Sequence, residues 1–264
     1  MKINFKNKTI LVTAGSKGIG FEIAKYFLRS GAKVCICSRS KKNLDNAKKH
    51  FLKISDSTKF LCLQTDISIL KNHSSMLKKI KTKFNNSVDI LINNSGGPPA
   101  KSIDKTTLKD WNLAINSNLM SGVLLSKLVI NNMKKKKWGR IINLTSTTAK
   151  EPAENMVLSN VTRAGLSSFS KTLSREVAQY GITVNTILTG GCLTDRFFSL
   201  VKKVSKNKKD FDSNLRQVIN SSPMKKIAKP EEFIKLIIFL ASENSSYING
   251  SAIPVDGGSS KTIF

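Results

Sequence analysis

A glycine-rich stretch near the amino terminus has the composition of a phosphate-binding turn. It reads TAGSKGIG, residues 13–20, and lies between an apolar run and a segment whose apolar residues recur at helical spacing. Glycines there allow a tight turn and a close approach of backbone to a pyrophosphate, whose charge the amino terminus of the following helix meets. Its position after the first apolar run makes this stretch a specific prediction of a dinucleotide site. The cofactor contacts expected in it are Ala14, Gly15, Ser16, Lys17, Gly18, Ile19 and Gly20.

The end of the second apolar run indicates which dinucleotide is bound. A carboxylate at this place would bind the ribose 2′-hydroxyl of NAD, but the chain has Ser38 followed by Arg39. Lys17 of the glycine-rich stretch supplies a second cation. Two cations and no carboxylate suit a 2′-phosphate, so we expect NADP rather than NAD. The competing interpretation is that both side chains only lie in solvent.

Short apolar runs alternate with amphipathic helical segments along the whole chain. The runs are residues 8–15, 33–38, 59–66, 88–94, 139–146, 182–188 and 251–258. They are apolar throughout rather than at every second residue, which predicts strands covered on both faces. We therefore expect an α/β fold of the Rossmann type, doubly wound, with a seven-stranded parallel sheet and helices on both faces.

The chain shows no linker or internal repeat, so residues 1–264 are expected to form a single NAD(P)-binding domain. One segment, at about 190–223, departs from the alternation and has the apolar spacing of two short amphipathic helices. An insertion after the carboxyl end of a strand is placed to cover a ligand. We expect a substrate lid, and the alternative is a packing element without that role.

Composition excludes several other classes of protein. Lys and Arg number 44 against 17 Asp and Glu, a net charge of +27, which could suit a nucleic-acid backbone. The cations are mostly lysines scattered along the chain, with one tight run at 134–137 and no interleaved aromatic residues, so no specific nucleic-acid partner is expected.

Without 18 consecutive apolar residues or a signal sequence, we expect no membrane span and a cytoplasmic protein. Cys35, Cys37, Cys62 and Cys192 lack metal-ligand spacing, and the first three lie in predicted buried strands, so we expect reduced thiols and no metal.

Several further motifs resemble the short-chain dehydrogenase/reductase family, of the type that includes 3-oxoacyl-acyl carrier protein reductases. They occur in the family's order over nearly the entire chain: TAGSKGIG, TDI, NNSG, NSNL, NLTS, VNTILTGG followed by TD, and YINGSAIPVDGG. The resemblance implies further cofactor contacts at Asp66, Ile67, Asn94, Gly96, Thr189 and Gly190.

Two residues of the cofactor loops depart from the family pattern. Ala14 replaces the first loop glycine, and we expect it to occupy a turn that needs no positive φ. Thr189 stands where a proline usually precedes Gly190, which leaves the conformation of that loop open.

The resemblance also implies an active site, with two substitutions. In the family a serine, a tyrosine and a lysine four residues beyond it act together, and an asparagine on a neighbouring helix supports a proton-relay water. Ser146 and Asn118 match their positions, whereas the stretch RAGLSSFSKTLSREVAQYGITVN places Ser159 at the tyrosine and Arg163 at the lysine. Residues four apart share a helix face, so both side chains would point at the cofactor.

The two substitutions differ in their consequences. The Arg163 guanidinium can still donate to ribose hydroxyls and keep a positive charge beneath the nicotinamide. Ser159 can donate a hydrogen bond, but an aliphatic hydroxyl is a far weaker acid than a phenol, whose reference pKa is about 10. The remaining tyrosines (Tyr26, Tyr180, Tyr247) and the histidines (His50 and His73, both expected on surface helices) are not expected near the site.

Three functions therefore remain open. The leading one is reduction of a carbonyl, on a small or acyl-carrier substrate, or oxidation of the matching alcohol. The second is hydride addition to a conjugated double bond, where a delocalised enolate needs less acid. The segments KEPAENM, TDRF and DGGSSK resemble a tyrosine-less branch of the family, found in bacilysin-type biosynthesis, that performs this reduction. The third is NADP binding without turnover, as a sensor or assembly partner.

The resemblance further implies a homotetramer or homodimer. We expect the helix that spans about 159–180 to form part of an interface, because small residues on one side would permit close helix approach. These residues are Ser167, Ser170, Ser174 and Ala178.

Overall fold

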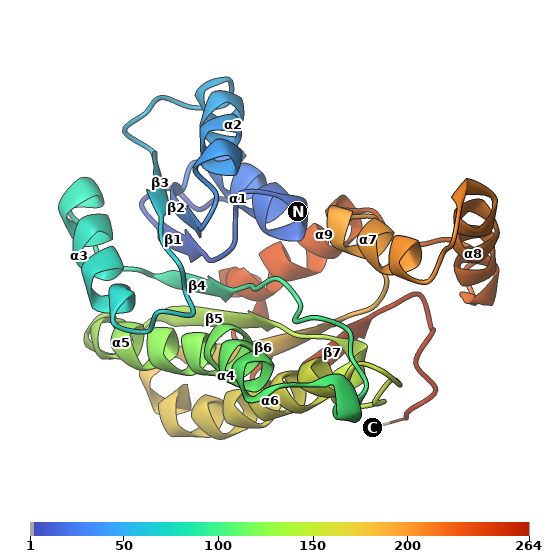
Figure 1. Cartoon of the computed structure of the whole chain (residues 1–264). Helices are drawn as coiled ribbons and strands as arrows, with labels where there is room; N and C mark the ends of the chain where they lie inside the picture. Colours follow the sequence, from blue (N-terminus) through green and yellow to red (C-terminus); the bar gives the residue numbers. More distant parts are fainter. Residues whose placement is uncertain (1–2, 264) are drawn as a thin grey trace.

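The chain folds into a parallel sheet with helices on both faces, as the computed structural model of residues 3–263 shows (Figure 1). Within those residues the sheet has seven strands in the order β3-β2-β1-β4-β5-β6-β7, all parallel. The strands are β1 (Thr9–Val12), β2 (Lys33–Ser38), β3 (Phe60–Gln64), β4 (Ile90–Asn93), β5 (Gly139–Leu144), β6 (Ile182–Thr189) and β7 (Ala252–Val255). The predicted α/β, Rossmann-type fold is confirmed.

Helices connect the strands. The longer ones are α1 (Gly18–Arg29), α2 (Lys41–Leu52), α3 (Asn72–Phe84), α4 (Leu108–Ile115), α5 (Ser121–Lys136), α6 (Val157–Val177), α7 (Asp195–Lys203), α8 (Lys208–Ser221) and α9 (Pro230–Ala241). Short helical turns are η1 (Ile103–Lys105), η3 (Thr147–Ala149), η4 (Ala178–Tyr180), η5 (Glu243–Ser245) and the π-helical turn η2 (Asn116–Met120).

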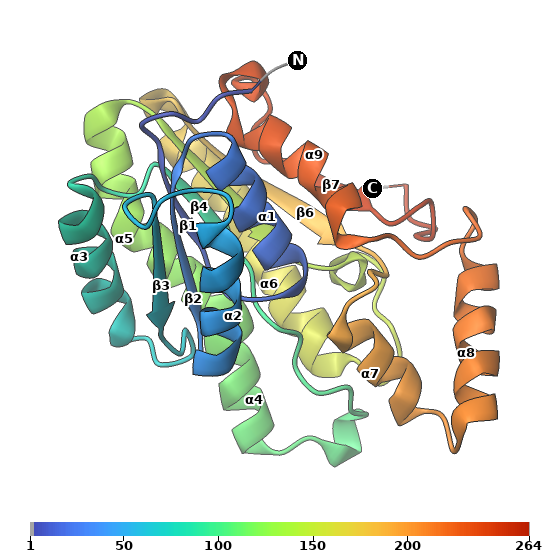
Figure 2. The ribbon, with the colours of Figure 1, turned by 90° about the horizontal axis from the view of Figure 1, so that it is seen from above.

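Successive residues of the strands pack into two separate cores. Ile10 and Val12 of β1 face α1, α2 and α9, whereas Leu11 between them faces α3, α5 and α6. Both faces of each central strand are therefore apolar, which is why the runs read as continuous rather than alternating. Figure 2 shows α1 and α2 on one side of the sheet and α3 and α5 on the other.

Strand order reverses between β1 and β4, which pair through Ile10 and Ile90. In doubly wound sheets, the crevice outside the carboxyl ends of the strands at such a reversal is where ligands bind. The loops that follow β1 and β4 both begin there, so the glycine-rich stretch and the NNSG motif meet at this point.

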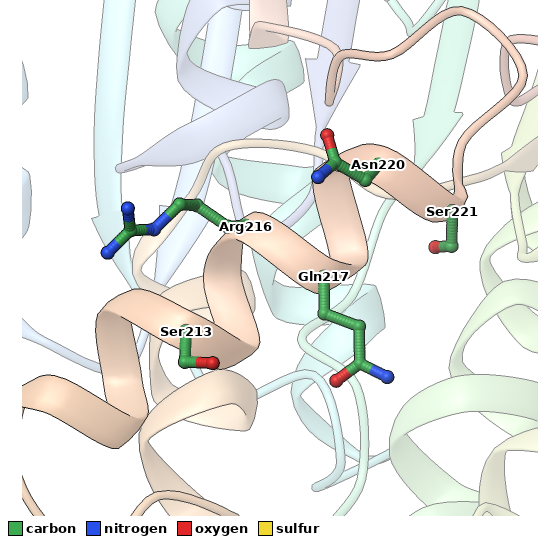
Figure 3. A pocket seen from close by; sticks show the side chains of 5 residues that line it. All are labelled: Ser213, Arg216, Gln217, Asn220 and Ser221. Atoms are coloured by element: carbon green, nitrogen blue, oxygen red, sulfur yellow. The ribbon is translucent and has the colours of Figure 1, made fainter.

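The insertion contains the two expected helices, α7 and α8. Thr194 caps α7 by accepting from the Phe197 amide, and Asn207 caps α8 by accepting from the Asp210 amide. Helix α8 has no fully buried side chain among its residues and lies at the periphery of the molecule (Figure 1). The hollow along it is lined by residues of α8 alone, Ser213, Arg216, Gln217, Asn220 and Ser221 (Figure 3), so it contains none of the expected catalytic residues.

Two expectations about buried residues were wrong. His73 is not on the surface: its side chain is fully buried at the start of α3, where its Nε2 lies 2.9 Å from the Ile67 carbonyl oxygen. Cys62 is only half-buried, whereas Cys35 and Cys37 are fully enclosed. Burial raises the pKa of the Cys37 thiol to about 12, so this side chain is an inert apolar group.

The small residues of α6 do not form an exposed stripe. Ser170 and Ser174 face the interior, because the Ser170 hydroxyl accepts from Asn143 and the Ser174 side chain packs against Gly250. The reason given for placing α6 at an interface is therefore wrong for these two serines.

One helical run is long and apolar enough to cross a membrane, judged by length and composition alone. It extends over Leu108–Lys136, through α4, η2 and α5. Polar residues interrupt it, so it is not a continuous apolar run. Its α5 part packs on the sheet through Leu125, Val129 and Met133, as a helix of the core does.

Candidate active site

The turn after β1 packs so closely that glycine is required at two positions. A Cβ on Gly15 would lie 2.7 Å from Ile36 Cγ2, and one on Gly20 would lie 2.6 Å from Asn94 Nδ2. The expectation for Ala14 was wrong, because its φ is 46°. An L residue rarely adopts this conformation; here the Ala14 carbonyl accepts from Asn94 Nδ2 at 3.3 Å, which helps to hold it.

The amino terminus of α1 suits an anionic ligand. Lys17 is its N-cap residue and has no side-chain oxygen with which to accept from the first turn, and this turn contains no acidic residue. Its amide groups are thus left to a ligand such as a pyrophosphate. Across the crevice, a Cβ on Gly96 would meet no atom within 4 Å, so there is space beside this loop. These features fit a dinucleotide.

The loops after β1 and β4 are joined by Thr13 and Asn94. The Thr13 hydroxyl donates to the Asn94 carbonyl at 2.6 Å and accepts from the Asn94 amide at 2.8 Å. Because Asn94 also donates to Ala14, a single residue of the NNSG motif fixes the glycine-rich turn.

The two cations expected at a 2′-phosphate lie in different surroundings. Arg39 follows β2 and is exposed, and its backbone carbonyl accepts from Gln64 Nε2 at 3.1 Å. Lys17 instead forms an ion pair with Asp195 of α7, with its ammonium 2.8 Å from the carboxylate. Ser38, also at the end of β2, accepts from the Ser40 amide.

Asp66 and Ile67 shape the loop after β3. The Asp66 carboxylate accepts from the Ser68 amide at 2.9 Å and from the Ser68 hydroxyl at 2.7 Å, which closes a local turn. The Ile67 carbonyl accepts from His73. Burial lowers the pKa of His73, so this imidazole is neutral and donates through Nε2.

Ser159 and Arg163 share the buried face of α6, as their spacing predicts. Ser159 is 5% exposed and Arg163 7%. The Arg163 Nη1 donates to the Leu144 carbonyl at 2.6 Å, and Nη2 lies 3.4 Å from the Ser95 carbonyl. Burial, followed by the charge of Arg196, lowers the pKa of Arg163 to about 10, so this guanidinium stays positive at neutral pH.

Ser146 lies two residues beyond Leu144, the residue to which Arg163 is bonded. It begins η3, and its oxygen accepts from the Thr148 amide at 3.2 Å, which leaves its hydrogen free to donate. Among residues 3–263, no hydrogen bond engages the Ser159 hydroxyl. The Arg163 anchor thus brings α6 to the end of β5, where these two hydroxyls are available.

Asn118 lies in the π-helical turn η2, a distortion frequently found at functional sites. Its Oδ1 accepts from the Ser95 hydroxyl at 2.9 Å, and its Nδ2 donates to Ser117. Ser95 therefore links Asn118 to Arg163, a contact that the sequence motif did not reveal. 

A chain of buried hydrogen bonds connects β4 and β5 to α6. Asn93 at the end of β4 donates to Asn143 of β5, and Asn143 donates to the Ser170 hydroxyl, each at 2.7 Å. Such a chain of buried amides fixes the rotation of α6, since every member would lose a partner if the helix turned.

The Thr189 loop is held firmly despite the missing proline. The Thr189 hydroxyl donates to the Thr145 carbonyl at 2.8 Å, beside Ser146, and the Gly190 amide donates to Val255 at 3.0 Å. A Cβ on Gly190 would lie 2.6 Å from Asp256 Cβ, so glycine is needed there.

Arg196 is a residue to which the sequence analysis assigned no role. It lies in the first turn of α7, and its Nη2 donates to the Pro98 carbonyl at 2.5 Å. Arg163 and Arg196 both donate to carbonyls of the loop after β4, at Ser95 and Pro98, so the two cations lie beside the same loop. Its position directly after the TD motif, at the start of an amphipathic helix, is the signal that could have identified it.

The tyrosines lie away from this region. Tyr180 and Tyr247 precede β6 and β7, and Tyr26 is near the end of α1, so all three lie toward the amino ends of the strands. Ser146 follows the carboxyl end of β5. Within residues 3–263 no tyrosine replaces Ser159.

The chain is similar to several reductases over nearly its full length. Residues 13–260 match the family described as enoyl-(acyl carrier protein) reductase. NADPH-dependent reductase BacG of Bacillus subtilis (strain 168) is 32% identical over 257 residues, 97% of this chain and 99% of that protein. The 3-oxoacyl-[acyl-carrier-protein] reductase FabG of Escherichia coli (strain K12) is 34% identical over 256 residues, 97% and 98% of the two chains.

Solved structures with a similar fold also include reductases. L-sorbose reductase from Gluconobacter frateurii, complexed with NADPH and L-sorbose, has a TM-score of 0.93 and 30% identity, covering 100% of both chains. YwfH, an NADPH-dependent reductase involved in bacilysin biosynthesis, has a TM-score of 0.90 and 31% identity, covering 97% of this chain and 99% of that one. The chain therefore belongs to the short-chain dehydrogenase/reductase family. It is an NAD(P)-dependent oxidoreductase of that family.

Proposed function

We propose that this protein is an NADPH-dependent reductase of a carbonyl compound, with the substrate oxygen bound by the Ser146 and Ser159 hydroxyls. The observation that carries the proposal is the anchor from Arg163 to the Leu144 carbonyl, which joins α6 to the end of β5 and so brings the two serines to one region. A 3-oxoacyl group, on an acyl carrier or a small molecule, is the substrate class that the FabG relatives suggest. The matching alcohol would be oxidised in reverse.

The cofactor would be held by the turn at 14–20, by Ser38 and Arg39, by the loop residues Asp66, Ile67, Asn94, Gly96, Thr189 and Gly190, and by Arg163. NADPH supplies the hydride when bound. Similarity to BacG and to an NADPH complex favours NADPH over NADH, as do Arg39 after β2 and Lys17 in the glycine-rich turn.

The chain's own residues stabilise negative charge on the substrate oxygen rather than supply a strong acid. Two hydroxyl donors aimed at a developing oxyanion each contribute a hydrogen bond, and the Arg163 charge favours the anion electrostatically. With a pKa of about 10, Arg163 keeps its own proton at neutral pH. The proton that completes the alcohol would come from the Ser159 hydroxyl, which would in turn take a proton from a solvent water molecule.

A second candidate is reduction of a carbon–carbon double bond conjugated to a carbonyl. It is favoured by the serine at position 159, because an enolate spreads its charge and depends less on acid assistance than an alkoxide does. The description of the matching family, enoyl-(acyl carrier protein) reductase, points the same way.

The position of a deuterium label separates the candidates. With NADPH deuterated at the transferred position, cyclohex-2-enone takes the label at C1 if the carbonyl is reduced and at C3 if the double bond is reduced. Ethyl acetoacetate should be consumed only by a carbonyl reductase. Ser146→Ala and Ser159→Ala should each lower kcat by about 10²-fold or more, the effect of removing an oxyanion donor.

Ser168→Ala is the matched control, since Ser168 is an exposed serine of α6. NADPH binding without hydride transfer to these compounds, or to acetoacetate and 4-oxopent-2-enoate, would refute both candidates and favour a non-catalytic role. Full activity of Ser146→Ala would refute the assignment of the donors.

We also propose a cytoplasmic homotetramer or homodimer. Exposed apolar side chains on neighbouring helices, Leu113 of α4, Leu128 of α5 and Val161 of α6, support a self-association surface. Light scattering that shows a monomer at micromolar concentration would contradict it.

A further inference from the structure

Two guanidinium groups contact the loop after β4, beside the proposed substrate region, and have no acidic partner in the part of the chain that the structure describes. Arg163 is 7% exposed and Arg196 is half-buried. Neither forms an ion pair with any residue in 3–263, and the buried Nε of Arg163 has no hydrogen-bond partner there. Burial lowers the pKa of both groups, and the charge of Arg196 lowers that of Arg163 further. The region thus holds an excess of positive charge.

One short loop fixes both groups. The Ser95 carbonyl accepts from Arg163, and the Pro98 carbonyl accepts from Arg196. Between them, a Cβ on Gly97 would lie 3.3 Å from both Nε and Nη2 of Arg196. The Arg196 guanidinium therefore lies close against this loop, and its remaining N–H groups are left for another ligand.

The nearest acid along the chain does not neutralise Arg196. Asp195 pairs with Lys17 on the glycine-rich turn, and Thr194 lies against Gly18, since a Cβ there would be 3.4 Å from Thr194 Cγ2. Asp195 and Thr194 thus contact the glycine-rich turn, whereas Arg196 contacts the loop after β4. Partly buried cations without a counter-charge are unfavourable, and an anion bound beside them removes that cost.

We propose that the substrate carries a carboxylate, which Arg196 binds. The inference rests on the proposed function, which places the reacting carbonyl at Ser146 and Ser159. A guanidinium matches the two oxygens of a carboxylate with parallel hydrogen bonds, and Arg163 adds attraction without a direct contact. Arg196 is then a specificity residue that selects an oxo acid over the ester or thioester of the same skeleton.

Matched pairs of substrates test the inference. Acetoacetate and ethyl acetoacetate, and 4-oxopent-2-enoate and its methyl ester, each differ only in the carboxylate. With NADPH saturating, kcat/KM is expected to favour the acid by about 10- to 100-fold, the usual effect of a charge-assisted hydrogen bond. Arg196→Gln should remove this preference by slowing the acid alone, and Arg196→Lys should restore part of it.

Arg216→Gln on α8 is the matched control and should change neither rate, since Arg216 lies on the exposed face of that helix. Equal losses for acid and ester in Arg196→Gln would overturn the inference. A weaker NADPH affinity in this variant, measured by calorimetry, would also overturn it, because Arg196 would then serve the cofactor phosphates.

A binding measurement separates failure of this inference from failure of the proposed function. In NADPH-loaded protein, 3-hydroxybutanoate and its methyl ester cannot react, so calorimetry reports the carboxylate alone. Tighter binding of the acid, lost in Arg196→Gln, would support the carboxylate site even if no oxo compound were reduced. Equal binding of acid and ester would refute the site whatever the activity.

Discussion

The Lys17 ammonium lies 2.8 Å from the Asp195 carboxylate and so joins the glycine-rich turn to the first residue of α7. Both side chains are largely exposed, at 59% and 77%, and an ion pair of this kind contributes only about 0–1 kcal/mol. Lys17 is also a cation expected at a 2′-phosphate. A phosphate with a charge near −2 would compete with Asp195 for it, so we expect cofactor binding and the placement of α7 to be coupled.

Asp195→Asn should therefore strengthen NADPH binding and leave NADH unchanged. Removing the carboxylate frees Lys17 for the phosphate, and a pair of this strength corresponds to a gain of about two- to fivefold in affinity. Fluorescence titration of both cofactors measures it. Asp212→Asn, which makes the same change of charge on α8, should have no such effect; equal gains in the two variants would show that only net charge matters.

Arg39 should decide the preference between cofactors. A charge-assisted contact to phosphate contributes about 1.5–3 kcal/mol, so Arg39→Ala should weaken NADPH binding at least tenfold and leave NADH nearly unaffected. Arg29→Ala, an exposed arginine at the end of α1, is the control. Equal loss for both cofactors in the Arg39 variant would contradict the assignment.

The fold could be predicted because the same sequence pattern, a short continuous apolar run, occurs at every central strand. Each central strand is apolar on both faces, so β1, β4 and β5 could be recognised without knowledge of their neighbours. The spacing of Ser159 and Arg163 likewise fixed their common face on α6, since helical geometry is local.

Other features depend on contacts between distant segments. The positive φ of Ala14 is held by Asn94, and the burial of His73 depends on the packing of α3. Ser174 faces inward because Gly250 lies against it. Arg196 has a long side chain whose direction is set by Gly97 and Pro98, and nothing in its own neighbourhood of the sequence indicates that loop.

His73 should make stability depend on pH. Burial lowers the pKa of this imidazole below its usual value of about 6.5, so the unfolded chain binds a proton that the folded chain excludes. The contribution of the neutral His73 imidazole to the free energy of unfolding is present above pH 6.5 and is lost as the pH falls through the pKa of the folded state. The expected slope is at most about 1.4 kcal/mol per pH unit for one proton.

Urea unfolding between pH 5 and 8 measures this slope. His73→Gln should flatten it below pH 6.5, even if the variant is less stable at every pH. His50→Gln on the exposed surface of α2 is the control. An unchanged slope in His73→Gln would show that the imidazole is protonated in the folded protein as readily as in the unfolded chain.

A Ser159→Tyr, Arg163→Lys double variant tests the assignment of α6. A general acid contributes about 10²- to 10⁴-fold, so restoring a phenol beside a lysine should raise ketone reduction at least tenfold over the natural protein. Reduction of an enone should gain less, because its enolate needs less acid. Steady-state rates on ethyl acetoacetate and cyclohex-2-enone measure the contrast, and circular dichroism verifies the fold.

The control for this double variant is Ser168→Tyr, on the exposed side of the same helix, which should give no gain in ketone reduction. A folded double variant with unchanged NADPH affinity and no gain on any ketone would mean that Ser159 does not occupy the place of the family's tyrosine.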